Sequence, residues 1–194
     1  MSKLYFRYGA MNCGKSTALM QVAHNYEENG KKVFVVKSSI DTKADDRLSS
    51  RIGIERKVDL LIEPEDSFEK YYDFLSHIDC ILVDEAQFLT PKQVEELWFF
   101  SKMCDVPVIC YGLKTNFQSF LFPGSKRLLE LADQLDELVT ICSCGKKAKF
   151  NARLVNGSFA YEGDSVVIDG ANEDTEYKPM CGKCYSKKMK GRFQ

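Results

Sequence analysis

The sequence predicts an α/β fold: an open, mostly parallel sheet with helices on both faces, followed by a small C-terminal lobe. Short apolar runs, such as 33–36 and 80–83, alternate with segments of helical periodicity as far as about residue 141. Such alternation is typical of parallel sheets, whose strands are connected through helices. Beyond that point short turns containing Gly and Asn replace the helical periods. We therefore predict two domains, residues 1–141 and 142–194.

Composition and charge narrow the classes of function. Of the 194 residues, 44% are hydrophobic and 28% are charged, which is typical of a soluble globular protein and excludes disordered or low-complexity chains. Lys and Arg number 27 against 28 Asp and Glu, so the chain lacks the basic excess of proteins that bind nucleic acid mainly through phosphates. No uncharged apolar run reaches the ~18 residues of a membrane span, and none near the start suits a signal peptide. We expect a cytoplasmic protein with no nucleic-acid or membrane partner.

The first predicted elements follow from periodicity and from glycine. Residues 3–8 are predicted to form a strand, and 9–16 a loop bounded by glycines. The run 33–36 predicts a buried strand, whereas the polar stretch 38–57 lacks periodicity and predicts a long loop. A helix is predicted from Lys15, with Gly30 suited to cap its end, because these apolar residues fall on one face: Leu19, Val22, Ala23 and Tyr26.

The later elements complete the alternation. Residues 66–76 are predicted to be helical, and 80–83 to form another buried strand. Thr90 is suited to N-cap a helix that has Pro91 at its first position. The remaining predicted elements are a strand at 106–113, an amphipathic helix at 125–135 and a last strand at 137–141.

A phosphate-binding loop is predicted between the first strand and the first helix. Backbone N–H groups of such a loop surround phosphate oxygens, and its glycines allow the tight turn. The following helix directs its N-terminal dipole at the same anion, Lys15 adds a point charge, and Ser16 can ligate Mg²⁺. A chance match is the alternative, but the strand, loop and helix occur in the required order. The residues that fit the pattern G-x-x-x-x-G-K-[ST] are Gly9, Ala10, Met11, Asn12, Cys13, Gly14, Lys15 and Ser16.

Two acidic residues follow the buried strand 80–83. An Asp at a strand end in a P-loop protein holds the Mg²⁺ shell, and Asp84 fits that role. Glu85 comes next, where the chain leaves the sheet, and a carboxylate there can take a proton from a substrate hydroxyl or orient a water molecule. The alternative is that both are exposed loop acids. Their place after an apolar strand and downstream of the phosphate loop favours function.

Eight cysteines divide into single residues and two close pairs. In a reducing compartment, paired cysteines favour a metal over a disulfide. Four thiolates fill the tetrahedral shell of Zn²⁺, so this site is predicted to be structural rather than catalytic. Unligated buried thiols are the alternative. The predicted ligands are Cys142 and Cys144 in the first pair and Cys181 and Cys184 in the second.

Taken together, these residues resemble the compact, zinc-containing class of thymidine kinases, the type II class of the cytosol and of bacteria. The resemblance covers nearly the whole chain. Its motifs follow in order: the phosphate loop, residues 84–88, residues 111–117, residues 122–124, and the two cysteine pairs with Tyr177 just before the second.

The resemblance implies transfer of the γ-phosphoryl group of ATP to the 5′-hydroxyl of thymidine, in the salvage synthesis of dTMP. It implies Glu85 as general base, and ATP and Mg²⁺ bound by the phosphate loop with Asp41, Asp84 and Gln87. It also implies structural Zn²⁺, a homotetramer and feedback inhibition by dTTP. A lasso between the cysteine pairs would close over the nucleoside. The residues implied to bind the nucleoside are Met11, Phe88, Leu113, Phe117, Asn151, Val167, Ile168 and Tyr177.

The sequence departs from this family pattern in several places. The first cysteine pair is C-x-C, where many members have C-x-x-C. Lys43 stands where the family has an Arg, and only Arg binds phosphate in a bidentate manner. Asp169 and Gly170 replace a Gly-Gly pair, and a longer stretch leads from there to Tyr177. Asn151 falls where a small hydroxyl residue can face the thymine methyl group, so base selectivity could differ.

Two other functions use the same residues. A P-loop ATPase would use Glu85 to orient water and would release ADP without a nucleoside. A non-catalytic, nucleotide-gated module would contact DNA or RNA through the zinc lobe in a salt-sensitive way, and the net charge of −1 argues against it. Among the aromatic residues, Phe88 and Phe117 are assigned to the site, whereas Phe120 is predicted to lie in the core.

Overall fold

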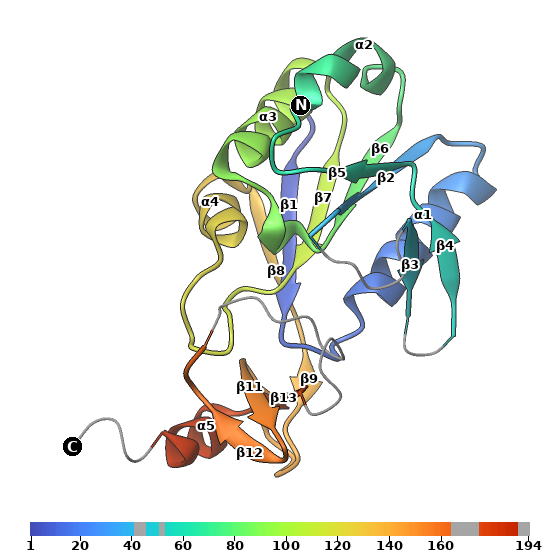
Figure 1. Cartoon of the computed structure of the whole chain (residues 1–194). Coiled ribbons are helices and arrows are strands. Elements are labelled where there is room, and N and C mark those ends of the chain that lie inside the picture. The colour runs from blue at the N-terminus through green and yellow to red at the C-terminus, as the bar shows by residue number, and fades with distance from the viewer. Residues whose placement is uncertain (41–45, 51–52, 164–174, 190–194) are drawn as a thin grey trace.

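A parallel sheet forms the centre of the larger part of the molecule. The computed structural model describes residues 1–40, 46–50, 53–163 and 175–189 (Figure 1). The sheet has six strands in the order β5-β2-β6-β7-β1-β8, and all of its strand pairs are parallel, which confirms the predicted fold class. Its strands are β1 (Leu4–Gly9), β2 (Val33–Ser38), β5 (Leu60–Ile62), β6 (Cys80–Asp84), β7 (Val108–Gly112) and β8 (Gln134–Leu138).

Helices cover both faces of this sheet. Helix α1 lies on one face, and α3 and α4 lie on the other (Figure 1). Within the described chain, no helix combines the length and the apolar character needed to cross a bilayer. The helices are α1 (Lys15–Glu28), α2 (Tyr72–Leu75), α3 (Pro91–Met103), α4 (Pro123–Leu131) and α5 (Gly182–Lys188), with short 3₁₀ turns η1 (Phe68–Tyr71) and η2 (Ala86–Phe88).

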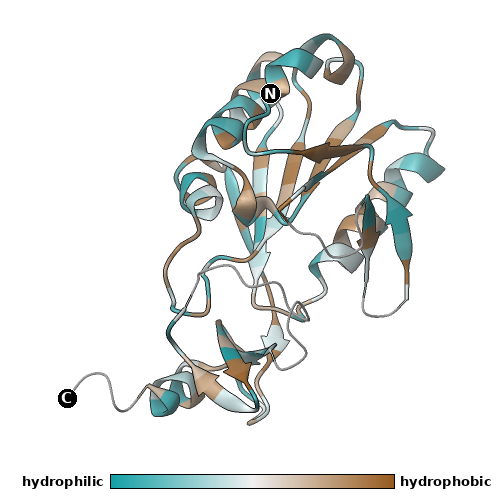
Figure 2. Cartoon of the chain, viewed as in Figure 1, coloured by the Kyte–Doolittle hydropathy of each residue, from teal (hydrophilic) through white to brown (hydrophobic). Residues whose placement is uncertain are grey.

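The sheet separates two apolar cores. Successive side chains of a strand point to opposite faces, so Ile81 and Val83 of β6 pack on the α3 side, while Cys80 and Leu82 pack with α1. Figure 2 shows hydrophobic residues concentrated in the central strands, with hydrophilic stretches on the surrounding helices. This burial on both faces explains why the central strands β2, β6 and β7 contain short, continuous apolar runs.

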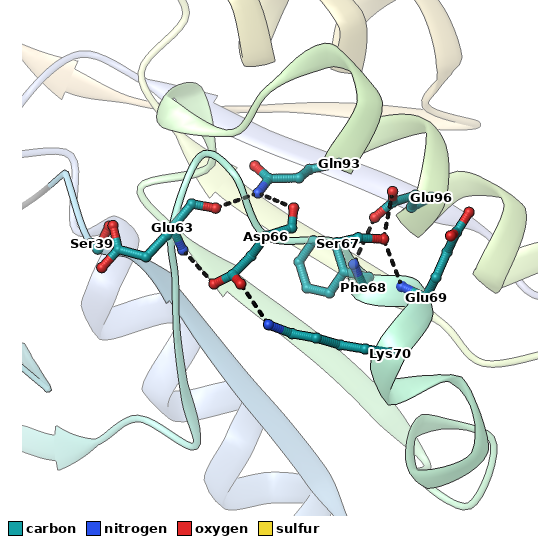
Figure 3. Close-up of polar contacts among 9 residues, drawn as sticks. All are labelled: Ser39, Glu63, Asp66, Ser67, Phe68, Glu69, Lys70, Gln93 and Glu96. Atoms are coloured by element: carbon teal, nitrogen blue, oxygen red, sulfur yellow. Dashed lines mark hydrogen bonds and ion pairs between the residues drawn. The ribbon is translucent and has the colours of Figure 1, made fainter.

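The start of α3 is fixed by a network of polar contacts (Figure 3). Thr90 and Gln93 form a reciprocal capping box, with Pro91 in the first turn, as the sequence predicts for Thr90 and Pro91. The buried side-chain amide of Gln93 also donates to the carbonyl oxygens of Glu63, at 2.7 Å, and Asp66, at 3.0 Å. The helix is therefore tied to the loop that follows β5.

A second group of contacts extends this network along α3 (Figure 3). The carboxylate of Glu96 accepts from the Ser67 hydroxyl at 2.9 Å and from the Phe68 N–H at 2.7 Å. The N–H of Glu69 donates to the Ser67 hydroxyl at 3.1 Å, which caps the 3₁₀ turn η1. These bonds hold the start of η1 against α3.

Several elements differ from those the sequence predicts. The predicted loop 38–57 contains a two-stranded hairpin, β3 (Arg47–Ser49) and β4 (Glu55–Lys57). The predicted helix 66–76 is divided into η1 and α2, and the predicted strand 137–141 is divided between β8 and β9 (Thr140–Ile141). Strand β9 pairs with β10 (Lys147–Ala148), away from the parallel sheet. Pairing between segments, rather than local periodicity, decides these divisions.

The prediction that Phe120 lies in the core is wrong. Its side chain is 64% exposed. The Asn116 side chain accepts hydrogen bonds from the N–H groups of Gln118 and Phe120, and Ser119 has a φ of 65°. This tight turn directs Phe120 outward at its tip, so local turn geometry overrides the usual preference of an aromatic ring for the interior.

The C-terminal lobe is built from small antiparallel sheets. Strands β12 (Ser158–Ala160), β11 (Phe150–Val155) and β13 (Thr175–Met180) form one sheet, with β11 in the centre. Phe150 and Ala152 of β11 face Tyr185 of α5, with the Phe150 and Tyr185 rings stacked at 4.8 Å. The alternate residues, Asn151 and Arg153, therefore point to the opposite side, toward the parallel sheet domain.

Candidate active site

The predicted phosphate loop runs from the end of β1 to the start of α1. Asn12 and Gly14 have φ angles of 65° and 80°, so the loop turns through the left-handed region just before the helix. A Cβ atom at Gly9 would lie 2.5 Å from the Cys13 sulfur, so only glycine fits there. The Lys15 ammonium folds back over the loop and donates to the Ala10 carbonyl oxygen at 3.4 Å. The tight turn between strand and helix is the one that the sequence predicts.

Asp84 lies at the carboxyl end of β6 and meets the phosphate loop across β7, the strand that separates β6 from β1. The Ser16 hydroxyl donates to its Oδ2 atom at 3.0 Å. The side chain is only 3% exposed, and its Oδ1 atom has no hydrogen-bond partner among the described residues. Burial, reinforced by the neighbouring charge of Glu85, raises the pKa of Asp84 to about 7.

This arrangement fits a hard cation. A buried carboxylate oxygen without a partner, beside a hydroxyl group, offers the oxygen ligands that Mg²⁺ prefers. A cation would also favour the charged form of Asp84, which burial disfavours. Ser16 and Asp84 are therefore the residues that could hold Mg²⁺.

Glu85 follows Asp84 at a sharp bend. Its backbone has a φ of 50°, in the left-handed region, and η2 begins directly after it. Its side chain is partly exposed, unlike that of Asp84. The side-chain amide of Gln87 donates to the Glu85 Oε2 atom, and the N–H of Leu113 donates to the Gln87 Oε1 atom at 2.9 Å. Gln87 therefore contacts Glu85 and the chain after β7.

Phe117 is the centre of an aromatic group next to the C-terminal lobe. Its ring lies 6.5 Å from that of Tyr177, edge to face, so the structure brings together these two predicted nucleoside residues. The guanidinium carbon of Arg153 lies 3.8 Å from the centre of the Phe117 ring. Tyr185 donates its hydroxyl to the Phe117 carbonyl oxygen. Residues of the C-terminal lobe thus surround Phe117.

Asn151 connects the C-terminal lobe to the phosphate loop. Its Oδ1 atom accepts from the Met11 N–H at 2.8 Å, and its amide nitrogen donates to the Thr115 carbonyl oxygen at 3.3 Å. Both ends of this buried amide are used within the protein. A small cavity beside it is lined by Tyr8, Gly9, Ala10, Lys114, Thr115, Glu137, Lys149 and Asn151.

The other predicted site residues are distributed as follows. Phe88, in η2, packs edge to face on Phe122 with ring centres 5.6 Å apart. Asp41, Val167 and Ile168 lie outside the described residues, as do Lys43, Asp169 and Gly170. Sequence reasoning missed Arg153, although its alternation with Asn151 on one strand was a signal that could have placed both on the same face.

The four paired cysteines form one cluster. The sulfur atoms of Cys142, Cys144, Cys181 and Cys184 all lie within 4.8 Å of one another, with those of Cys144 and Cys181 at 3.5 Å. A tetrahedral Zn²⁺ with bonds of ~2.3 Å places its sulfur ligands ~3.8 Å apart, so these sulfur atoms need only small shifts to bind the ion. Four thiols leave no open position, so such a site is structural.

Local backbone geometry prepares this cluster. In the first pair, the N–H of Gly145 donates to the Cys142 carbonyl oxygen at 2.8 Å, and Gly145 has a φ of 82°, which closes a tight turn around the sulfur atoms. The N–H groups of Cys144 and Cys181 lower the pKa of Cys142 to about 6, because they stabilise its thiolate. The second pair lies at the start of α5. The C-x-C spacing therefore still brings both sulfurs of the first pair to one point.

Sequence comparisons with known proteins agree on one family. A family profile described as "Thymidine kinase" matches residues 2–185. A thymidine kinase of Chromobacterium violaceum is 44% identical over 191 residues, covering 95% of this chain and 98% of the relative. One from Streptococcus agalactiae is 45% identical over 187 residues, and one from Francisella tularensis is 42% identical over 189 residues. These two alignments cover 95% and 94% of this chain, and 97% and 96% of the relatives, respectively.

Similarity to solved structures is weaker. The crystal structure of a DNA replication initiation factor aligns with 71% of this chain and 40% of its own, at 17% identity and a TM-score of 0.45. A likeness of that size carries no argument about function. The family assignment rests instead on matches over nearly the full length, which include the phosphate loop, the acidic pair and the paired cysteines. This chain belongs to the thymidine kinase family.

Proposed function

We propose that this protein transfers the γ-phosphoryl group of ATP to the 5′-hydroxyl of thymidine and so produces dTMP for nucleotide salvage. The observation that carries the proposal is the contact between Ser16 of the phosphate loop and Asp84, with Glu85 one residue beyond it. An anion cradle, a buried carboxylate and a partly exposed carboxylate thus meet at one edge of the sheet. Its family membership supports thymidine as the acceptor.

The phosphate loop and the Asp84 edge would position ATP. Backbone N–H groups of residues 9–16 and the start of α1 favour the triphosphate, and Lys15 adds a positive charge at its end. Bound Mg²⁺, with Ser16 and Asp84 as its protein partners, would neutralise charge on the β- and γ-phosphates. We propose Asp41 as a further residue of the ATP and Mg²⁺ site, as the family resemblance implies.

Glu85 would act as the general base. The 5′-oxygen attacks the γ-phosphorus, the bond from that phosphorus to the β–γ bridging oxygen breaks, and the hydroxyl proton passes to the Glu85 carboxylate. ADP carries away the bridging oxygen. Phosphoryl transfer depends mainly on positioning and charge neutralisation, and base assistance typically contributes ~10²–10⁴ in rate.

The nucleoside would lie beside the aromatic group around Phe117. Its neighbours there are Tyr177 and Arg153. We assign nucleoside binding to the same residues that the family resemblance implies. They are Met11, Phe88, Leu113, Phe117, Asn151, Val167, Ile168 and Tyr177, with the last three in or beside the proposed lasso.

We also propose a cytoplasmic homotetramer with structural Zn²⁺ that dTTP inhibits. The geometry of the cysteine cluster supports the zinc, and the family resemblance supports the rest. Light scattering after gel filtration would measure the oligomer. Metal analysis should find one zinc per chain, and added dTTP should slow dTMP formation.

One experiment tests the reaction directly. The protein is incubated with ATP, Mg²⁺ and a panel of nucleosides, and any monophosphate is identified by mass. We expect dTMP from thymidine, with little ADP in the absence of nucleoside. Rapid ADP release that does not require a nucleoside would instead favour an ATPase in which Glu85 orients water.

A further inference from the structure

Gln87 is one of the most buried polar residues near the site, with a side chain only 1% exposed. It lies two residues after Glu85 in the 3₁₀ turn η2. Its amide nitrogen donates to the Glu85 carboxylate, and its amide oxygen accepts from the Leu113 N–H at 2.9 Å. A side chain buried this deeply, with both ends engaged, holds one conformation.

The surrounding backbone leaves room for this amide and little more. A Cβ atom at Gly112 would lie 2.7 Å from the Gln87 Oε1 atom, so β7 can approach only because it ends in glycine. A Cβ atom at Gly124, in α4, would lie 2.6 Å from the carbonyl oxygens of Ala86 and Leu89. The turn that carries Gln87 is therefore enclosed by β7 on one side and α4 on the other.

Leu113 is itself held from a second direction. The buried hydroxyl of Ser125 donates to the Leu113 carbonyl oxygen at 2.6 Å, while the N–H of Leu113 donates to the Gln87 side chain. The Gln87 amide thus joins the Glu85 carboxylate to a fixed point of the chain after β7. Glu85 is partly exposed and leaves the sheet at a left-handed bend. Among the described residues, the Gln87 amide is the group that hydrogen-bonds to its carboxylate and so restrains it.

We propose that Gln87 is a positioning residue for the reaction, rather than a ligand of ATP or Mg²⁺: it holds the Glu85 carboxylate in the orientation that receives the proton of the nucleoside hydroxyl. This inference rests on the proposed function. It predicts that Gln87 acts on turnover only through Glu85, and that its loss leaves the binding of ATP unchanged.

The test is a double-mutant cycle with Gln87→Met and Glu85→Gln, measured with ATP and thymidine. Methionine keeps the length of the side chain and removes both hydrogen bonds. We expect Gln87→Met to lower kcat by about 10- to 100-fold, since misplacing a reacting group by ~1 Å can cost ~10²-fold. The KM for ATP should stay within about twofold of that of the unchanged protein. In the Glu85→Gln background the same substitution should change kcat by less than about twofold.

Gln93 supplies a matched control. It is equally buried, at 1% exposed, and its amide also joins two backbone segments: it accepts from the Thr90 N–H and donates to the loop at Glu63 and Asp66, the latter bonds shown in Figure 3. Gln93→Met should lower the unfolding temperature without a selective fall in kcat. If Gln87→Met does not fold, Gly112→Ala displaces the same amide and takes its place in the cycle.

The outcomes separate this inference from the proposed function. An equal loss of kcat in both Glu85 backgrounds, or a loss confined to the KM for ATP, would overturn the positioning role. If the unchanged protein makes no dTMP, the proposed function fails, and crystal structures of the unchanged protein and of Gln87→Met then decide the role of Gln87. We expect the Glu85 carboxyl to leave its position in the variant; an unmoved carboxyl would refute the inference.

Discussion

The site is built by two regions that differ in how they are held together. The phosphate loop and the Asp84–Glu85 bend both leave a parallel sheet whose central strands are buried on both faces. The C-terminal lobe has only small sheets and small apolar clusters. Its buried cluster residues are Cys142, Ala148 and Cys181 in one group, and Ala152, Tyr185 and Met189 in the other.

This difference separates the two tasks of a kinase, phosphoryl transfer and binding of the acceptor. Asp84 is the last residue of β6 and Glu85 follows it directly, while Ser16 lies seven positions beyond the end of β1, so the sheet places the residues proposed for chemistry. The residues around Phe117 come from segments far apart in sequence, and the lobe places them through Arg153, Tyr177 and the cysteine cluster. Changes in the first region should affect turnover, and changes in the second should affect nucleoside binding.

The largest expected effect comes from Glu85→Gln. Loss of the general base should lower kcat by ~10²–10⁴, while ATP binding, measured by calorimetry, stays unchanged. Glu28→Gln, an exposed substitution in α1, is the control and should have no effect. Near-normal turnover in Glu85→Gln would remove this carboxylate from the mechanism. The sheet region would then lack the residue proposed as its general base.

Asp84→Asn tests how the buried carboxylate of the first region affects the stability of the protein. The folded-state pKa of Asp84 is raised to about 7, from the ordinary value of 3.8. The folded protein therefore holds a proton that the unfolded chain has lost between these pH values, so the free energy of unfolding falls as the pH rises through that window. The difference amounts to at most about 4 kcal/mol.

We therefore expect Asp84→Asn, without Mg²⁺ or nucleotide, to be more stable than the unchanged protein at pH 8. This gain should shrink toward pH 5, because Asp84 is then protonated. Denaturant unfolding at both pH values measures the gain, and Asp73→Asn is an exposed control. A gain of equal size at both pH values would show that Asp84 is not protonated in the folded protein at pH 5.

Cys181→Ser tests the second region. Loss of one thiolate should lower zinc affinity by at least about 10- to 100-fold, the range for losing an outer-shell partner of a metal ligand. We expect the KM for thymidine to rise more than the KM for ATP, because the lobe surrounds Phe117. Zinc content and steady-state kinetics measure both effects, and Cys104→Ser, outside the cluster, is the control. A purely catalytic defect would contradict the division of tasks.

Asn151→Leu probes the side chain of the lobe whose Oδ1 atom accepts a hydrogen bond from the Met11 N–H of the phosphate loop, at 2.8 Å. Leucine leaves the Met11 N–H without its acceptor, at a cost of about 1–3 kcal/mol if the group stays buried. The KM for ATP should rise by about fivefold to tenfold, whereas Asn156→Ala, on the turn after β11, should have no effect. An unchanged KM for ATP would show that the two regions are not coupled through Asn151.

The motifs were predictable because each is encoded locally. The spacing of Gly9, Gly14 and Lys15 specifies a loop between a strand and a helix, and the apolar run before Asp84 specifies a buried strand. Paired cysteines indicate a metal wherever the chain brings the pairs together. The assignment of Phe120 to the core failed because it relied on hydrophobicity alone, which does not report the turn made by Asn116.

The sequence by itself determined the fold class, the phosphate loop, the acidic bend and the two cysteine pairs, because backbone geometry within an element depends on neighbouring residues. Only the tertiary structure decided which distant groups meet. Examples are the bridge from Glu85 through Gln87 to Leu113, the contact of Asn151 with the phosphate loop, and the position of Arg153 over Phe117. These contacts depend on strand order, register and the packing of one lobe on the other, and no local spacing records them.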